Sequence, residues 1–191
     1  DYLLTGCSSI AKSIECSIAI CRILDKLDFQ STLIHAHSNL LNAIENPIGI
    51  FDLKKDRSRF SMDWYYPVLA GATQEDKFAN LIKAITNIFW VPGFGIKCVA
   101  DEPWVTVAET CECSIAFKKM GYENHAKELL LNAAAIVDEN SIPFMGWQLE
   151  EKIYWPEEQP SWTAGALILA ADANNALTKA SNLFLIKQFS S

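Results

Sequence analysis

The sequence predicts an all-α fold of about four helical hairpins, each with a buried inner helix and an amphipathic outer helix. The pentapeptide Glu-Cys-Ser-Ile-Ala occurs at residues 15–19 and again at residues 112–116. In both places it lies in an apolar helical pattern that is followed by a polar turn and a second, amphipathic pattern. Residues 64–72 (WYYPVLAGA) and 162–171 (WTAGALILAA) share this small-residue and aromatic character. The four segments therefore mark four hairpin starts.

The first helix of each hairpin is rich in Ala, Ser, Cys and Gly and carries little charge, as expected for a helix covered by neighbours on all sides. The second helices each carry one apolar stripe at three-and-four spacing, which indicates an outer position with one wet face. The stripes are Leu33, His37, Leu40, Leu41 and Ile44; Phe78, Leu81, Ile82, Ile85 and Ile88; and Ala126, Leu129, Leu130 and Ala133. Residues 177–189 are expected to supply the last outer helix.

Long connections separate the hairpins at residues 47–62, 89–103 and 137–160, and they hold six of the seven prolines. Connections of that length usually carry function or contain small strands. We expect a short β-hairpin formed by residues 144–147 and 153–155.

A closed ring of six such hairpins would need on the order of 300 residues, whereas this chain has 191 and begins with Asp instead of Met. We therefore expect a single domain, residues 1–191, that forms the C-terminal part of a longer chain.

The composition of the chain excludes some classes of binding partner. Half of the residues are apolar and a fifth are charged, with a formal net charge of −7, so no basic stripe is available for nucleic acid or an anionic membrane surface. The longest apolar stretch, near residues 164–171, is far shorter than the roughly 20 residues that span a bilayer. Most of the six cysteines lie in helical apolar patterns and are expected to be reduced, which favours a cytoplasmic location.

Four stretches resemble the C-terminal part of bacterial proteins with prenyltransferase-like or squalene-cyclase-like repeats. They are DYLLTGCSSI, RFSMDWYYPVLAGA, VPGFGIKCVADEPWVTVAETCECSIAF and WPEEQPSWTAGALILAADA, which cover nearly the whole chain in order. The resemblance implies an α/α toroid, here a partial one. Terpenoid cyclases, protein prenyltransferases and six-hairpin glycosidases share this fold, so the fold does not choose among their chemistries.

In a toroid the ligand occupies the central funnel, at the N-terminal ends of the inner helices and the loops before them. The catalytic candidates there are Asp63, Glu109 and Asp101. The candidates for binding substrate are Trp64, Tyr65, Trp104, Trp162 and Glu157.

Paired carboxylates among aromatic rings suit glycoside hydrolysis, because one acid protonates the leaving oxygen, the other acts as base or nucleophile, and the rings stack on sugar faces. Asp63 and Glu109 are the preferred pair. The structural alternatives are an N-cap role for Asp63 and a capping role or an ion pair with Arg59 for Glu109. For Glu15 and Glu112 a structural role is expected.

The leading hypothesis is thus a carbohydrate-active hydrolase that binds a small molecule or an oligosaccharide. An isoprenoid-handling cyclase or prenyltransferase is the alternative, with the aromatic residues stabilising cations, although residues 99–102 (VADE) do not reproduce the acid motif of the cyclases. A non-catalytic binding module is the third possibility.

No cofactor and no metal site is predicted. The three histidines, His35, His37 and His125, lie on predicted outer helices, and the Gly93-Phe94-Gly95 stretch lacks the context of a phosphate-binding loop. The oligomeric state is left open.

Overall fold

The computed structural model describes residues 2–189 and shows a mostly helical protein, so the predicted all-α class is confirmed. Seven α-helices lie within these residues: α1 (Leu4–Ile23), α2 (Leu27–Glu45), α3 (Met62–Leu69), α4 (Phe78–Ile88), α5 (Val107–Lys119), α6 (Glu123–Ala134) and α7 (Ser161–Asn175). The short strands are β1 (Trp90–Val91), β2 (Gly95–Ile96), β3 (Trp104–Thr106), β4 (Gly146–Gln148) and β5 (Ile153–Tyr154).

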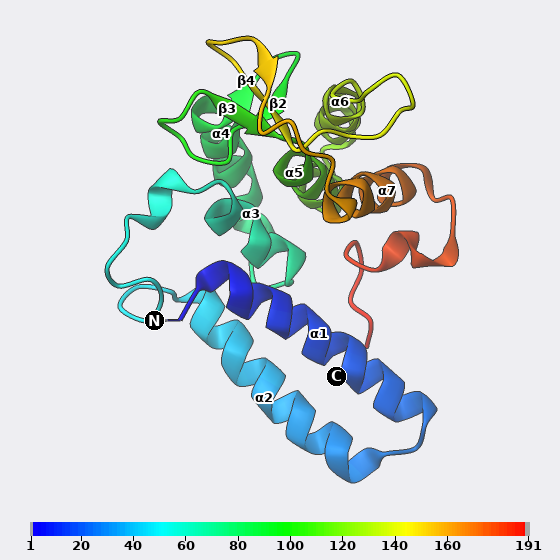
Figure 1. Ribbon diagram of the computed structural model, residues 1–191. Helices are drawn as coiled ribbons and strands as arrows, with labels where there is room; N and C mark the ends of the chain where they lie inside the picture. The colour runs from blue at the N-terminus through cyan, green and yellow to red at the C-terminus, as the bar shows by residue number, and fades with distance from the viewer. Residues whose placement is uncertain (1, 190–191) are drawn as a thin grey trace.

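The predicted inner helices form one row. Helix α1 contacts α3, α3 contacts α5, and α5 contacts α7, while α2 packs on α1 and α6 packs on both α5 and α7 (Figure 1). Ile82 and Ile85 of α4 belong to the same buried cluster as Tyr65 and Val68 of α3. This is the order expected of consecutive hairpins, and the closed ring itself stays a prediction.

Helix α5 is the most completely buried element because its sequence offers small apolar groups on every side. Cys111, Cys113, Ala116 and Phe117 are all fully buried within it. It stops at Gly121, whose φ of +83° places it in the left-handed region that favours glycine and that commonly ends helices. Helix α3 stops in the same way at Gly71, with a φ of +79°.

The predicted β-hairpin is present. Strands β4 and β5 pair antiparallel, and β3 adds a third strand against β4. Gly146 is required in β4, because a Cβ atom there would collide with the Val105 carbonyl oxygen and the Trp104 indole. Since β3 runs directly into α5, this sheet sets the position of the first turn of α5.

The expectation of a last outer helix over residues 177–189 is wrong. The chain leaves α7 through Ala176, whose φ is 53°, and then forms only a 3₁₀-helix, η3 (Lys179–Asn182). The Asp172 carboxylate accepts hydrogen bonds from the Thr178 amide and hydroxyl, both at 2.7 Å, which holds this turn in place of another helical turn. Residues 183–189, here called the C-terminal strap, then cross to α1 (Figure 1).

Two further findings concern the described residues. None of their helices is long and apolar enough to cross a membrane. All six cysteines are free thiols.

Candidate functional site

A cavity of about 360 Å³ lies among the four inner helices, and we call it the inner-helix cavity. Each helix of the row contributes to it: Ser9 from α1, Tyr66 from α3, Glu112 from α5 and Trp162 from α7. The C-terminal strap contributes Phe184. Its volume is in the range of small-molecule sites.

Glu112 is the carboxylate inside this cavity. The Tyr66 hydroxyl donates to its Oε1 atom at 2.9 Å, and the Tyr65 hydroxyl donates to its Oε2 atom at 3.2 Å. Burial, and after it the charge of Glu109 one helical turn away, raise the pKa of Glu112 to about 7, although the two tyrosine hydrogen bonds act in the opposite direction. A carboxyl group with such a pKa exchanges its proton readily near neutral pH.

This pKa predicts a stability effect. Because the native pKa of about 7 lies above the ordinary 4.5, the stability contributed by the protonated group is present below pH 4.5 and is lost as the pH rises through 7. Glutamine cannot ionise, so Glu112→Gln is expected to raise the free energy of unfolding by ~1–3 kcal/mol at pH 8 and to change it little at pH 4.5.

Urea unfolding at the two pH values measures this difference. Glu128→Gln, on the exposed face of α6, is the control. A Glu112→Gln protein that is less stable than the wild type at pH 8 would contradict the prediction.

Asp63 lies in the first turn of α3 and is half-buried. Its carboxylate forms no hydrogen bond or ion pair within residues 2–189, and it lines two further cavities of about 330 and 190 Å³. Burial, followed by the charge of Asp52, raises the pKa of Asp63 to about 6, against the opposing effect of Arg57 and Lys55. An unpartnered carboxyl group with a raised pKa is suited to donate a proton.

Glu109 occupies the first turn of α5, the neighbour of α3 in the inner row. Each of the two carboxylates is therefore in the first turn of its inner helix, but Glu109 lines none of these three cavities, whereas Asp63 lines two of them. Glu109 also interacts with Cys98. The pKa of Cys98 rises to about 12, first because of burial, then because of the charge of Glu109, and then because the Cys98 thiol is hydrogen-bonded to Glu109. The suggested ion pair with Arg59 is absent, because Arg59 binds Asp101 instead.

The other candidates are dispersed. Asp101 is exposed, and the Arg59 guanidinium donates to both of its oxygens at 3.0 and 2.9 Å, which lowers the pKa of Asp101. The Trp104 indole donates to the Trp155 carbonyl at 2.6 Å and packs edge-on against the Trp155 ring. Glu157 is exposed in the loop before α7.

The aromatic residues that were predicted to bind substrate also lie in different parts of the structure. Trp162 is half-exposed and lines the inner-helix cavity. Trp64 lines the larger cavity beside Asp63, and its indole donates to the Ser58 carbonyl at 3.0 Å. Tyr65 is fully buried in the core, so only its hydroxyl group serves the cavity, through Glu112.

The glutamate of the pentapeptide has different surroundings in the two copies. Glu15 forms a buried ion pair with Lys12 at 2.8 Å, whereas Glu112 opens into the cavity. Sequence reasoning gave both a structural role and so missed Glu112 as a cavity residue. The available signal was its spacing of three from Glu109, which puts both carboxylates on one face of α5.

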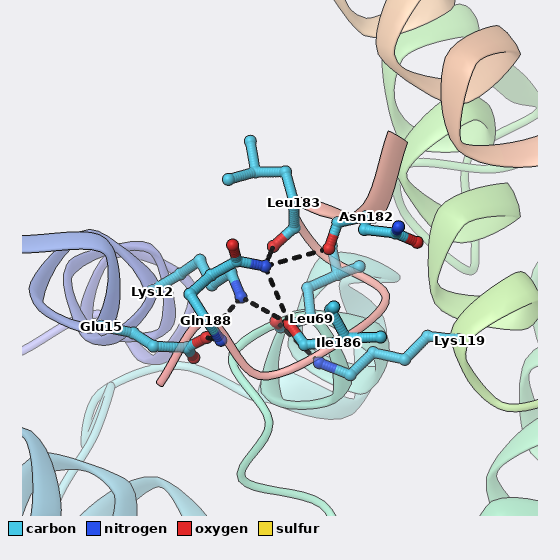
Figure 2. Close-up of polar contacts among 8 residues, drawn as sticks. All are labelled: Lys12, Glu15, Leu69, Lys119, Asn182, Leu183, Ile186 and Gln188. Atoms are coloured by element: carbon cyan, nitrogen blue, oxygen red, sulfur yellow. Dashed lines mark hydrogen bonds and ion pairs between the residues drawn. The ribbon is translucent and has the colours of Figure 1, made fainter. Parts of the chain in front are cut away.

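The Lys12–Glu15 pair also anchors the C-terminal strap (Figure 2). The Gln188 amide N–H donates to Glu15 Oε1 at 2.6 Å, and Lys12 Nζ donates to the Ile186 carbonyl at 3.4 Å. Nearby, Lys119 Nζ donates to the Leu69 carbonyl at 3.2 Å, and burial together with the charge of Lys12 lowers the pKa of Lys119 to about 8, against the effect of Glu15.

Comparison with known proteins gives one point of reference. No family model matches the chain. A protein of Mycolicibacterium hassiacum named MMP endo-(1,4)-3-O-methyl-alpha-D-mannosidase is 37% identical over 184 residues, which are 96% of this chain and 50% of that protein. The chain therefore spans about half the length of the curated relative that it matches.

Proposed function

We propose that this chain carries the acid and base groups of a glycoside hydrolase that cleaves 1,4-linked α-mannoside chains at internal bonds. The observation that supports the proposal is the position of Asp63 in the first turn of α3 and of Glu109 and Glu112 in the first two turns of the adjacent helix α5, with the pKa of Asp63 raised to about 6 and that of Glu112 to about 7. The similarity to a protein named as an endo-mannosidase supports it.

In this mechanism Asp63 is the general acid. Its carboxyl group keeps its proton up to about pH 6 and has no competing partner within the described residues, so it protonates the glycosidic oxygen as that bond breaks. Glu109 is the second carboxylate, which activates water or attacks the anomeric carbon. Trp64 and Trp162 offer flat faces on which sugar rings stack.

Glu112 supports Glu109 in this arrangement. Two carboxylates one helical turn apart repel each other when both are charged, and the raised pKa of Glu112, about 7, keeps that group largely protonated below neutral pH. The two tyrosine hydroxyl groups hold its side chain in place.

We also propose that further helical hairpins pack against this chain to complete a toroid. Ile10 and Ile20 of α1 and Ile168 of α7 are more than half exposed, although both helices belong to the inner row. The greater length of the mannosidase-named relative supports this arrangement.

The test is hydrolysis of 3-O-methylated 1,4-α-manno-oligosaccharides, followed by product analysis, with wild-type protein and Glu109→Gln. We expect Glu109→Gln to lower kcat by ~10²–10⁴-fold while the substrate still binds in calorimetry. Glu128→Gln on α6 is the matched control and should retain full activity.

Unchanged turnover in Glu109→Gln would remove that residue from the mechanism. Thermal stabilisation by a prenyl diphosphate, with no hydrolysis of any oligosaccharide, would instead support the isoprenoid alternative.

A further inference from the structure

We propose that the two cavities beside Asp63 form one binding cleft, in which the sugars before and after the cleaved bond occupy different cavities. This inference rests on the proposed hydrolase function and names the residues that hold the substrate on each side of the acid. The inner-helix cavity is a separate space, because Asp63 does not line it.

The two cavities meet at Asp63. The larger one, of about 330 Å³, and the smaller one, of about 190 Å³, share two lining residues, Asp63 and Arg57, and their other lining residues differ. A sugar chain that extends through both cavities therefore passes the Asp63 carboxyl group at their boundary. This is where an acid that protonates the oxygen between two sugars has to lie.

The start of α1 lies between the two cavities. Leu4 lines the larger cavity, whereas its neighbours Leu3 and Thr5 line the smaller one. The Leu4 amide N–H donates to Oδ2 of the buried Asp52 at 3.0 Å, which ties the start of α1 to the connection between α2 and α3 (Figure 1). The element that divides the cleft is thus held in place.

The segment before α3 is held at the same boundary. Ser58 lines the larger cavity, and its carbonyl accepts the Trp64 indole N–H at 3.0 Å. Phe60 lines the smaller cavity, and its carbonyl accepts the Asp63 amide N–H at 3.2 Å. The backbone around Asp63 is therefore fixed by hydrogen bonds, while its carboxyl group forms none within residues 2–189, as suits a group that must meet a substrate in one geometry.

Each cavity combines apolar and charged side chains. The larger cavity has Trp64 beside Lys77, and the smaller one has Met62 beside Lys55. A sugar ring has C–H faces that pack on apolar or aromatic groups and hydroxyl groups that bind to charged ones. Both cavities therefore have the groups needed to bind a sugar ring.

The test fills each cavity in turn. Thr73 lines the larger cavity and Thr5 the smaller one, and both are only partly buried, so Thr73→Trp and Thr5→Trp should fold. We expect each variant to lower kcat/KM for a long 3-O-methylated 1,4-α-manno-oligosaccharide by about tenfold or more. The matched control is Thr32→Trp, which is exposed near the start of α2 and lines neither cavity, and it should leave kcat/KM unchanged.

The position of the cut identifies the two sides of the cleft. With an oligosaccharide labelled at its reducing end, blocking the side that holds the non-reducing part should lengthen the labelled fragment, and blocking the other side should shorten it. Thr73→Trp and Thr5→Trp are therefore expected to shift the cut in opposite directions. Lys77→Ala and Lys55→Ala, at exposed residues that each line one cavity, form a second pair that should shift the cut in the same two directions, even if a tryptophan variant does not fold.

Shifts in one direction only, or an equal loss of kcat/KM in Thr32→Trp, would overturn the two-sided cleft while leaving the hydrolase function intact. If wild-type protein hydrolyses no oligosaccharide, the hydrolase proposal fails. Calorimetric dissociation constants for the same oligosaccharide then decide the cleft separately. Binding that both Thr73→Trp and Thr5→Trp weaken supports it, and binding that either variant leaves unchanged, or no binding at all, overturns it.

Discussion

Asp63→Asn is expected to lower kcat for oligosaccharide hydrolysis by ~10²–10⁴-fold. Asparagine has nearly the same shape as aspartate but cannot supply a proton to the leaving oxygen. Binding should change little, because the Asp63 carboxylate makes no hydrogen bond within the described residues that the substitution would break.

The pH profile makes this prediction specific. The pKa of Asp63 is raised to about 6, so in the wild type the rate should fall as the pH rises through 6, where the acid loses its proton. In Asp63→Asn the remaining activity should lack that alkaline limb.

Asp76→Asn, an exposed aspartate just before α4, is the control and should behave as the wild type does. An Asp63→Asn protein with an unchanged rate and an unchanged pH profile would exclude Asp63 as the general acid.

Glu15→Gln is expected to lower the free energy of unfolding by ~3–5 kcal/mol. The substitution removes the negative charge beside Lys12 Nζ, which is 2.8 Å away and buried, and leaves the ammonium group with neutral acceptors only, namely the new amide oxygen and the Ile186 carbonyl. A buried charge without its counter-ion is costly, whereas the pair itself contributes much less to net stability.

Urea unfolding of wild type, Glu15→Gln and Lys12→Met/Glu15→Leu distinguishes the two effects. The double variant removes both charges and should lose less stability than Glu15→Gln alone. The Gln188 amide should also exchange its hydrogen faster in the double variant, because its acceptor, Glu15 Oε1, is gone. Glu128→Gln should leave both readouts unchanged, and a Glu15→Gln protein within 0.5 kcal/mol of wild type, which is about the usual range for surface substitutions, would refute the prediction.

The hairpins could be predicted because their signals are local. The stripe containing Ile82 and Ile85 repeats at the period of a helix, and small residues on every face mark α5 as an inner helix. The β-hairpin followed from the Pro-rich connection that contains it, and only its exact pairing required the structure.

The final segment could not be predicted in this way. Residues 177–189 contain enough apolar residues for an outer helix, but Asp172 binds the backbone of Thr178 and turns the chain at Ala176. That turn depends on a side-chain contact six residues apart, which apolar periodicity does not register.

The sequence by itself determined the helical class, the order of the hairpins and the place of Asp63 and Glu109 near the starts of inner helices, because these properties depend on residue type and spacing along a few turns. Only the tertiary structure decided that Glu112 shares a cavity with Tyr66 and Trp162, whereas Glu15 is buried in an ion pair. It also decided that Asp101 is paired with Arg59 on the surface. The physical reason is that the charge state and accessibility of a carboxylate depend on burial and on partners from distant parts of the chain. The two copies of the pentapeptide also differ just before the glutamate: Lys12, three positions before Glu15, forms its ion pair, whereas Glu109 stands three positions before Glu112 and raises its pKa.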